Sequence, residues 1–480
     1  MATRRGGVIS AVALYSSMST VLTRSAATPW RAELRAYLAL SLPLVLTNAI
    51  EMGLNLTSAA MIGRIAPEAL AASTLALALY NTCLMFGIGL AAALSPLIAR
   101  ERGAATADAP RAITRLIQGG LWNGLAVVVP VWVLLWQAEP VFRLAGQDTG
   151  IAHMAAGYLH AMQWSLLPAL VYLTLRSVLA ALEQPRWTVV IGAAAIPLNA
   201  GLNWLLIDGH WGFPALGLEG SGLATCLANV FMAVALGLVV TFDARFRPYR
   251  AFTSLGAPPL QTCAALWQLG TPIGIGIVLE VGMFTASTAL IGHYDAPALA
   301  AHAIALQVAS FAFMVPLGFA QAATVRIGRA AGARDRRAID RAGAVALALG
   351  IGVMMLSACA LLGMPRTLIG FFIDAGEPGA AAIVASAVVL LAIAGLFQVA
   401  DGAQVVLAGM LRGLEDTRGP MVIALLGYWG VGLPLAAVLA AHHAAPGVWM
   451  GLTAGLCAVA VLLYWRWTRL RTAAAPPPAA

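Results

Sequence analysis

The sequence predicts an all-α polytopic membrane protein with about twelve transmembrane helices in two pseudo-symmetric six-helix lobes. Three observations support this fold class: the composition, the recurrence of long apolar blocks, and an internal repeat. The chain is 61% hydrophobic and 10% charged, and a helix of about 18 apolar residues or more can cross the ~30 Å hydrocarbon core. Because the blocks are long and continuous, they predict helices and not the alternating strands of a β-barrel.

The apolar blocks give the expected spans in chain order. Short polar or arginine-bearing connections separate them, and prolines inside several blocks are tolerated in membrane helices, where they can act as hinges. The expected spans cover residues 36–62, 69–99, 116–138, 151–180, 187–207, 219–242, 263–292, 298–325, 342–363, 380–408, 419–440 and 446–468.

Positive charge is distributed unevenly along the chain. All 28 basic residues are arginines, and nearly all of them lie on alternate connections, with Arg64, Arg143 and Arg366 on the others. The positive-inside rule therefore predicts that both termini are cytoplasmic, which agrees with an even number of spans. The net charge of +8 follows from this topology, so we expect no nucleic-acid partner.

The absence of lysine excludes two kinds of chemistry. A Walker A loop needs its lysine on the phosphates, and Schiff-base cofactors need a lysine amine. Any transport by this chain is therefore ion-driven or passive unless a separate ATPase assists. The sequence implies no ATPase subunit and no cofactor other than a coupling Na⁺ or H⁺.

The chain contains an internal repeat. A shift of 229 residues aligns the region from Pro43 with the region from Pro272, and about a third of some sixty positions are identical. The aligned pairs include Glu51 with Glu280, Gly63 with Gly292, Gly89 with Gly318, Arg100 with Arg329 and Gly103 with Gly332, and Leu182–Arg186 later matches Leu414–Arg418. Two lobes of the same orientation predict a pseudo-two-fold axis along the membrane normal and a cavity between the lobes. By analogy only, this arrangement favours alternating access over an enzyme scaffold.

The repeat and the charge pattern suggest five segments. The first thirty residues are either a weak targeting-like or surface-lying extension or the product of a translation start placed too early, and we favour an extension without a specific role. The Pro/Ala-rich end is expected to be disordered. The expected segments are an N-terminal extension (1–35), an N-terminal six-helix lobe (36–242), a cytoplasmic linker (243–262), a C-terminal six-helix lobe (263–470) and a tail (471–480).

Three carboxylates are expected at membrane depth: Glu51, Glu280 and Asp401. No arginine is expected near a span centre. A charge at mid-bilayer costs roughly 2.5–3.5 kcal/mol, so such residues usually face a cavity or a partner. One interpretation is a structural carboxyl hydrogen-bonded to a neighbouring helix. The other is a partly desolvated carboxyl that exchanges H⁺ or Na⁺ with a cationic substrate, so that its charge state couples the two. For Glu51 the two interpretations are about equal.

Aromatic and polar residues near these carboxylates are candidates for a substrate cavity. Phe284 lies one turn after Glu280, and Phe397 lies one turn before Asp401, so each ring could share a face with a carboxylate and bind an organic cation. Packing is the commoner role for such rings, and interhelical hydrogen bonding is the commoner role for polar residues within spans. The polar candidates are His302, Gln307, Gln398, Asn199 and Asn203.

Three classes of function remain open. Acidic sites beside aromatic rings favour transport of organic cations. A lipid or lipid-linked oligosaccharide flippase is second, because the anionic cargo of such a protein would require buried arginines. A membrane-embedded enzyme is a distant third, since the sequence shows no acidic DxxD-type pair, histidine cluster or activated nucleophile at a membrane edge. We therefore do not expect an enzyme.

Four segments resemble the multidrug and toxic compound extrusion (MATE) family, NorM-like branch. They are "LGTPIGIGIVLEVGMFTASTALIG" from Leu269, "LAAHAIALQVASFAFMVPLGFAQAATVRIGRAAGA" from Leu299, "FQVADGAQVVLAGMLRGLEDTRGP" from Phe397 and "PLNAGLNWLLIDGHWGFPALGLEGSGLAT" from Pro197. The resemblance covers residues 36–468. It implies two six-helix bundles, antiport of drugs against Na⁺ or H⁺, and a place in the bacterial inner membrane. The implied partners are small cationic substrates and membrane lipids, and we expect a monomer.

The resemblance also assigns roles to single residues. Glu280 and Asp401 match the cation-site carboxylates of the family, so Na⁺ or H⁺ is expected there. Ser58 stands where many members carry the aspartate of a "DT" pair, and Glu51 lies seven residues earlier, on nearly the same helix face, where it could substitute. This departure makes the C-terminal pair the stronger candidate for coupling. Phe397 replaces a tyrosine of some Na⁺-linked members, which slightly favours H⁺.

Overall fold

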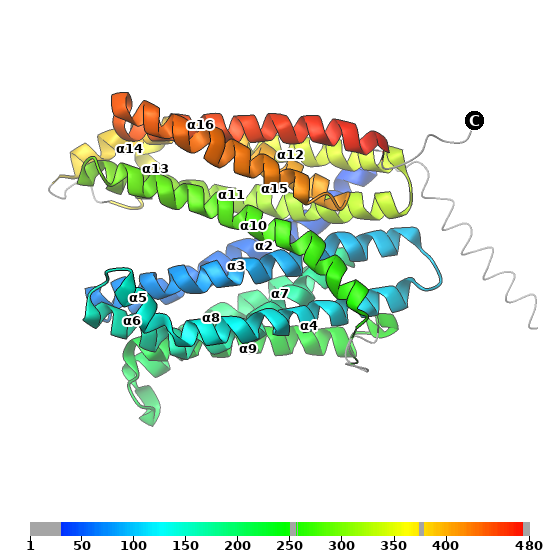
Figure 1. Cartoon of the computed structure of the whole chain (residues 1–480), viewed down its shortest axis with the longest axis horizontal. Helices are drawn as coiled ribbons and strands as arrows, with labels where there is room; N and C mark the ends of the chain where they lie inside the picture. Colours follow the sequence, from blue (N-terminus) through cyan, green and yellow to red (C-terminus); the bar gives the residue numbers. More distant parts are fainter. Residues whose placement is uncertain (1–29, 250–255, 257, 374–378, 474–480) are drawn as a thin grey trace, which may run out of the picture.

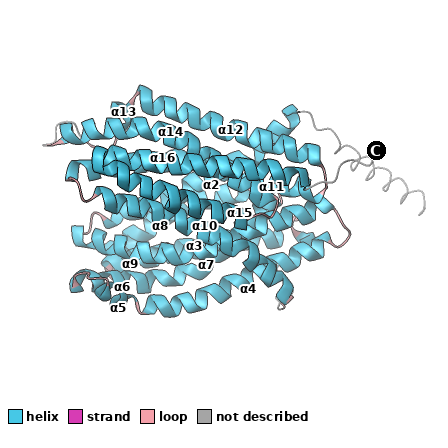
Figure 2. Ribbon diagram, turned by 45° about the horizontal axis from the view of Figure 1, so that its top comes forward, coloured by secondary structure: helices cyan, strands magenta, loops and turns pink. Residues whose placement is uncertain are grey.

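The computed structural model describes residues 30–249, 256, 258–373 and 379–473. The described part is helical and contains no strand (Figure 2). The predicted extension lies outside the described residues up to residue 29, and the predicted tail lies outside them from residue 474. Part of the predicted linker, residues 250–255 and 257, is also outside them.

The N-terminal half forms six spans. They are packed so that α2 contacts α8 and α3 contacts α4 and α7. Short α5 (Ala138–Leu144) connects two of the spans. The spans are α2 (Trp30–Ile62), α3 (Pro67–Ala104), α4 (Ala109–Trp136), α6 (Thr149–Met162) with α7 (Leu166–Ala181), α8 (Arg186–Asp208) and α9 (Gly217–Phe242).

The C-terminal half repeats this pattern, with α11 packed on α14 and α10 on α15. Short α13 (Pro365–Ile369) is the counterpart of α5. The spans are α10 (Leu260–Ile291), α11 (Ala296–Gly332), α12 (Arg336–Gly363), α14 (Ala380–Gly413), then α15 (Arg418–Ala424) with the π-helical η4 (Leu425–Gly432), and α16 (Leu433–Ala473).

By length and composition, 11 described helices can cross a membrane, and the last of them runs from Arg418 to Ala473. Its backbone breaks at Ala444, where φ is 49° and ψ is −132°. Two segments therefore meet at this residue, which agrees with the predicted boundary between residues 440 and 446. The predicted fold class, an all-α membrane protein of about twelve spans in two lobes, is confirmed.

Helix starts follow from local sequence. Asp148 accepts hydrogen bonds from the backbone nitrogens of Gly150 (2.8 Å) and Ile151 (3.3 Å) at the start of α6. Asp295 accepts one from Ala298 (2.6 Å) at the start of α11. These side chains satisfy backbone donors that have no partner within the helix, which stabilises each helix by about 1 kcal/mol.

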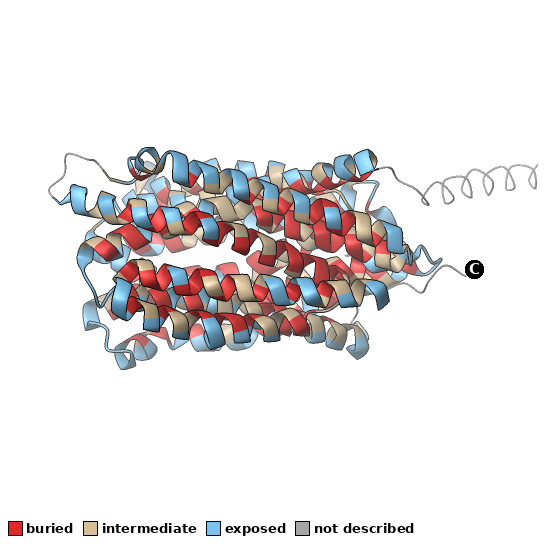
Figure 3. Ribbon diagram, turned by 90° about the horizontal axis from the view of Figure 1, so that it is seen from above, coloured by how far each residue is buried: buried red, intermediate tan, exposed pale blue. Residues whose placement is uncertain are grey.

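In Figure 1, α4, α8 and α9 of the N-terminal half lie on one side and α12, α14 and α16 of the C-terminal half on the other, with α2, α3, α10 and α11 between them. The two halves meet where α3 contacts α10 and α11 and where α2 contacts α11. Buried residues gather inside the bundle, whereas the helix ends are exposed (Figure 3). Large apolar side chains such as Val133 (67% exposed) and Leu356 (71%) face outward, as a lipid-facing surface requires.

Several helices extend beyond the predicted spans at the end of the bundle where α3, α7, α11 and α14 finish, here called the arginine-rich end. There Arg329 donates to both carboxylate oxygens of Glu183 at 2.9 and 2.8 Å. Arg326 binds Glu183 at 3.3 Å and Glu33 at 2.6 Å. Burial alone would raise the pKa of Glu183, but the guanidinium groups of Arg329, Arg102 and Arg326 outweigh it and lower that pKa.

A matching contact lies across the pseudo-symmetry axis. Arg100 of α3 pairs with Glu415, which follows α14. Here α3 and α11 approach so closely that a Cβ atom added at Gly103 would lie 2.0 Å from the carbonyl oxygen of Arg329, and one added at Gly332 would lie 2.1 Å from that of Arg100. Only glycine permits this approach. The cross-lobe ion pairs, Arg329–Glu183 and Arg100–Glu415, therefore flank a direct backbone contact.

Candidate functional site

Glu280 lies on α10, two helical turns beyond Pro272, and is half-buried. It lines a narrow cavity of about 70 Å³ inside the C-terminal lobe. Gln404 and Arg412 of α14 and Tyr428 of η4 line the same cavity. The glutamate therefore faces a polar space between α10, α14 and η4 and not lipid.

Asp401 lies on α14 and is 7% exposed. The side-chain amide of Gln404, one turn later, donates to its Oδ1 at 3.3 Å. The hydroxyl of Tyr428 donates to Gln404 Oε1 at 3.0 Å. Sequence reasoning missed Gln404 and Tyr428. The i, i+3 spacing of Gln404 from Asp401 could have predicted that the two side chains are neighbours on α14. The sequence offers no pattern that predicts the π-helical turn that brings Tyr428 to Gln404.

The structure brings the two predicted carboxylates of the C-terminal lobe into one region. Gln404 lines the cavity of Glu280 and donates to Asp401, so both carboxylates lie beside this cavity, which Arg412 also lines. Neither carboxylate forms a salt bridge with any described residue. A partly buried pair of unpaired carboxyls can accept a proton or a small cation, because either one relieves their mutual repulsion.

The carboxylate of the N-terminal lobe has a different environment. Arg176 of α7 donates to both oxygens of Glu51, at 2.5 and 2.6 Å. Its other terminal nitrogen donates to Asn48 and, at 3.5 Å, to Gln321 of α11. The expectation of no arginine at this depth was wrong, because Arg176 lies five residues before the end of α7 and its long side chain extends inward. Glu51 is therefore charge-compensated.

Ser58 does not join Glu51. Its hydroxyl donates to Asn199 Oδ1 at 2.9 Å, and Asn203 donates to the same oxygen at 3.1 Å. Asn199 and Asn203 of α8 are at most 2% exposed in this structure. Asn199 connects α8 to Ser58 of α2, and such interhelical hydrogen bonds are the commoner role of polar residues within spans.

The predicted aromatic residues form a packed cluster. Phe284 and Phe397 have ring centroids 6.0 Å apart, and Phe397 lies 5.2 Å from Trp449. The Trp449 indole donates to His302 Nδ1 at 3.1 Å, and His302 Nε2 lies 2.9 Å from the Thr288 hydroxyl. Phe397 and His302 are at most 1% exposed. In this structure their rings are buried between α10, α11, α14 and α16, and a place in a substrate cavity stays a prediction.

The two glutamine candidates differ. Gln398 is 2% exposed and accepts a hydrogen bond from Ser357 at 2.6 Å, so it too lies within a helix contact and not on a cavity wall. Gln307 is half-buried on α11. Among the described residues no group of three or more His, Cys, Asp or Glu side chains could hold a metal ion.

Comparisons with known proteins agree with this architecture. The MatE family model matches residues 43–205 and again residues 272–438, and the two matches begin 229 residues apart (272 − 43), as the internal repeat does. The chain is 44% identical over 449 residues to a probable multidrug resistance protein NorM of Brucella suis, covering 93% of this chain and 95% of that protein. A protein of the same description from Mesorhizobium japonicum is 44% identical over 450 residues, covering 93% and 96%.

Solved structures share the fold at low identity. The eukaryotic MATE transporter AtDTX14 has a TM-score of 0.82 at 20% identity, covering 93% of this chain and 98% of that chain. An outward-facing multidrug resistance MATE family transporter of the MOP superfamily has a TM-score of 0.83 at 17% identity, covering 92% and 96%. These likenesses establish the arrangement of the helices.

Proposed function

The chain belongs to the MatE family of multidrug efflux transporters, and we propose that it exports cationic, amphipathic drugs and toxic compounds in exchange for Na⁺ or H⁺ by alternating access. The observation that carries this proposal is the pair Glu280 and Asp401. Both are carboxyls within membrane-spanning helices, Gln404 lines the cavity of Glu280 and donates to Asp401, and no described residue forms a salt bridge with either. Such groups are rare in membranes unless they bind an ion or a substrate.

The two carboxylates give a simple exchange cycle. In their charged form the carboxylates bind an organic cation. Entry of H⁺ or Na⁺ neutralises them, and the organic cation is then released. Carboxylate oxygens and the amide oxygen of Gln404 are the hard ligands that Na⁺ prefers, and the same carboxyls can take a proton. Each charge moved inward gains about 2.3 kcal/mol per 100 mV of membrane potential.

We further propose a bacterial inner-membrane location with a cytoplasmic arginine-rich end, since arginines gather on the cytoplasmic side.

Flipping of lipids or lipid-linked oligosaccharides is the second candidate, and the buried arginines favour it. An anionic cargo needs uncompensated positive charge. Arg176 is 8% exposed, but both of its terminal nitrogens are engaged by Glu51 and Asn48. Arg412 lines the cavity of Glu280. Because each arginine faces a carboxylate, cation export is the better supported function.

Efflux of a fluorescent organic cation from proteoliposomes under an imposed Na⁺ or pH gradient tests the proposal. Wild type should respond to one gradient, which identifies the ion, and Glu280→Gln and Asp401→Asn should abolish the response. Exposed Glu68 supplies the matched control, because Glu68→Gln removes an acid far from the pair and should leave efflux intact. Absence of wild-type efflux under both gradients would overturn the antiporter proposal, and lipid flipping would be assayed next.

A further inference from the structure

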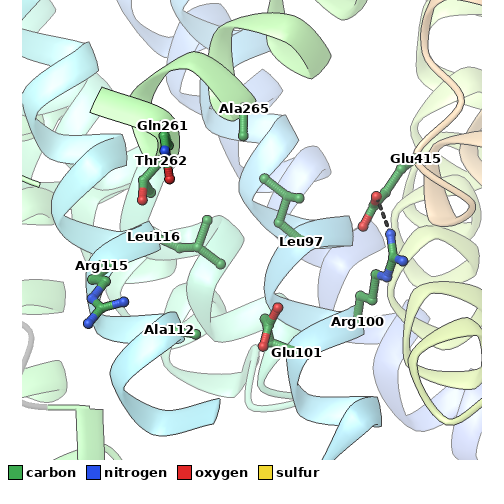
Figure 4. Close-up of a pocket in the computed structure, with 10 residues that line it drawn as sticks. All are labelled: Leu97, Arg100, Glu101, Ala112, Arg115, Leu116, Gln261, Thr262, Ala265 and Glu415. Carbon is green, nitrogen blue, oxygen red and sulfur yellow. Dashed lines mark hydrogen bonds and ion pairs between the residues drawn. The ribbon is translucent and has the colours of Figure 1, made fainter. Parts of the chain in front are cut away.

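A second cavity lies at the arginine-rich end, outside the carboxylate site. Its volume is about 420 Å³, within the roughly 300–1,000 Å³ of small-molecule sites. It lies between α3, α4 and the first turn of α10. Figure 4 shows Arg115 on one side and the Arg100–Glu415 pair on the other, with Leu97 and Leu116 between them.

The cavity lies at the level of the lipid head groups. With 38 residues, α3 is about 57 Å long, whereas a bilayer with its head groups is about 40–45 Å thick. Arg100 lies four residues before the end of α3, Arg115 six residues after the start of α4 and Thr262 two residues after the start of α10. At about 1.5 Å per residue, all three are within about 9 Å of a helix end.

The charges of the cavity are balanced but not all paired. Arg100 is held by Glu415. Arg115 and Glu101 also line the cavity, and neither has a hydrogen-bond or ion-pair partner in the described part of the chain. Among the described residues, one cation and one anion of the cavity thus lack a partner and can bind a ligand, and Leu97 and Leu116 supply an apolar wall. This combination fits a zwitterion attached to an apolar chain.

We propose that this cavity binds the phosphoethanolamine head group of a membrane phospholipid, with the phosphate at Arg115 and the primary ammonium at Glu101. Gln261 and Thr262 line the same cavity and can donate further hydrogen bonds to the phosphate. An anionic head group would leave Glu101 without a partner, and a choline head group has no N–H to donate to it. The cavity therefore selects a head group that carries both charges and a primary amine.

Occupancy of the cavity is linked to the contact between the lobes. Glu415 and the start of α10 belong to the C-terminal half, whereas Arg100, Glu101 and Arg115 belong to the N-terminal half, so separation of the lobes would open the cavity. A ligand that needs all the walls binds the closed arrangement more tightly and shifts the population toward it. This inference is independent of the transported substrate and of the coupling ion.

Titration of short-chain lipids into the full-length protein in detergent tests the site. The phosphatidylethanolamine form should bind about tenfold more tightly than the phosphatidylcholine or phosphatidylglycerol forms, the effect of one charge-assisted hydrogen bond. Arg115→Gln and Glu101→Gln should each remove this preference. Arg111→Gln is the matched control, because Arg111 is one turn earlier, exposed and paired with Asp108, and it should retain the preference. Arg115→Lys keeps the charge and should retain most of the binding.

Equal binding of the three lipids, or a preference that survives Arg115→Gln in a monodisperse protein, would overturn the site. Tighter binding of phosphatidylglycerol would overturn the zwitterionic ligand. Free phosphoethanolamine distinguishes the source of the head group. Weak binding of the free compound supports a membrane lipid as the ligand, whereas affinity equal to that of the lipid overturns it in favour of a soluble zwitterion.

Discussion

Glu51 and Glu280 occupy matching positions in the two halves of the chain, and their surroundings are opposite. Arg176 binds both oxygens of Glu51 at 2.5 and 2.6 Å, whereas Glu280 lines a cavity beside Asp401. The register that aligns Leu182 with Leu414, a shift of 232 residues (414 − 182), pairs Arg176 with Ala408 and Asp401 with Ala169.

Two positions contribute to the difference between the lobes. The N-terminal lobe has Arg176 where the C-terminal lobe has Ala408. The C-terminal lobe has Asp401 where the N-terminal lobe has Ala169. The glutamate of one lobe is thus paired with an arginine, whereas the glutamate of the other lobe has no salt bridge with any described residue and lines a cavity beside Asp401. We therefore expect the two glutamates to differ in their roles.

Neutralising the two glutamates separately is the strongest test of this comparison. Glu280→Gln should lower gradient-driven efflux by about 100-fold, because a neutral amide loses the charge-assisted contact with a cation. Glu51→Gln should lower efflux by less than about threefold if the protein is folded. Initial efflux rates from proteoliposomes, normalised to the amount of monodisperse protein, measure both. Equal losses would show that the lobes do not differ in coupling.

Ala408→Arg would give the C-terminal lobe the arginine that the N-terminal lobe has. Ala408 lines the cavity of Glu280, so a guanidinium there should pair with that glutamate and compete with the coupling ion. We expect efflux to fall by about tenfold or more. Ala408→Met is the control for added volume. A drop that Ala408→Met reproduces would be steric and would not support the comparison.

Removal of the negative partner should destabilise the N-terminal lobe. Glu51→Gln leaves Arg176 uncompensated inside the protein, which costs about 2 kcal/mol, below the 3–5 kcal/mol of fully buried pairs because the Glu51 side chain is 32% exposed. Thermal unfolding in detergent should show a lower midpoint, and the double variant Glu51→Gln/Arg176→Gln should recover part of the loss. Additive losses would mean that the pair contributes no coupling energy.

The glycine contact is alike in both halves, so matched changes should have matched effects. Gly103→Ala and Gly332→Ala each place a Cβ atom about 2 Å from a backbone oxygen, and relief of this overlap costs about 1–3 kcal/mol. Distances between spin labels on α3 and α11 at the arginine-rich end should increase by similar amounts in the two variants. Gly352→Ala is the control, since nothing lies within 4 Å of a Cβ atom there.

The ion pairs at the arginine-rich end should give the smallest effect. The lowered pKa of Glu183 means that its stabilisation is present above the ordinary pKa of glutamate and is lost as pH falls through the lower value in the folded protein. The free energy of unfolding of the wild type should fall by about 1 kcal/mol on acidification through this range. The Glu183→Gln variant should not show this fall. Thermal midpoints between pH 3 and pH 6 measure the difference. Identical pH profiles would contradict it.

Hydropathy and the repeat were sufficient to predict the fold class, because each span must be a long apolar helix and each half must repeat its pattern. The break at Ala444 was also foreseen, since polar residues and a proline follow the eleventh apolar block. Helix ends were underestimated where arginines extend beyond the membrane, as at Arg100 and Arg329. Such extensions are polar, so a hydropathy criterion does not count them.

The candidate site was predicted only in part. Glu280 and Asp401 stand out because a carboxylate interrupts an apolar run. Arg176 was missed because a basic residue near a span end looks like a boundary residue, and only the structure shows that it reaches Glu51. Phe397 was predicted to line a cavity because it lies one helical turn before Asp401. Spacing on one helix does not show which neighbouring residue packs on the ring, and in the structure Trp449 of α16 does.

The backbone contact at the arginine-rich end also bears on ancestry. Gly103 approaches Arg329 as Gly332 approaches Arg100, and these residues are aligned in the repeat. In an isologous homodimer, each contact between two residues occurs twice, once in each direction across the symmetry axis. The two glycine contacts have this pattern. A six-span ancestor pairing in parallel would have made this contact twice with a single glycine. In one chain the two copies can carry different neighbours, as Glu51 and Glu280 do, while both still make this glycine contact.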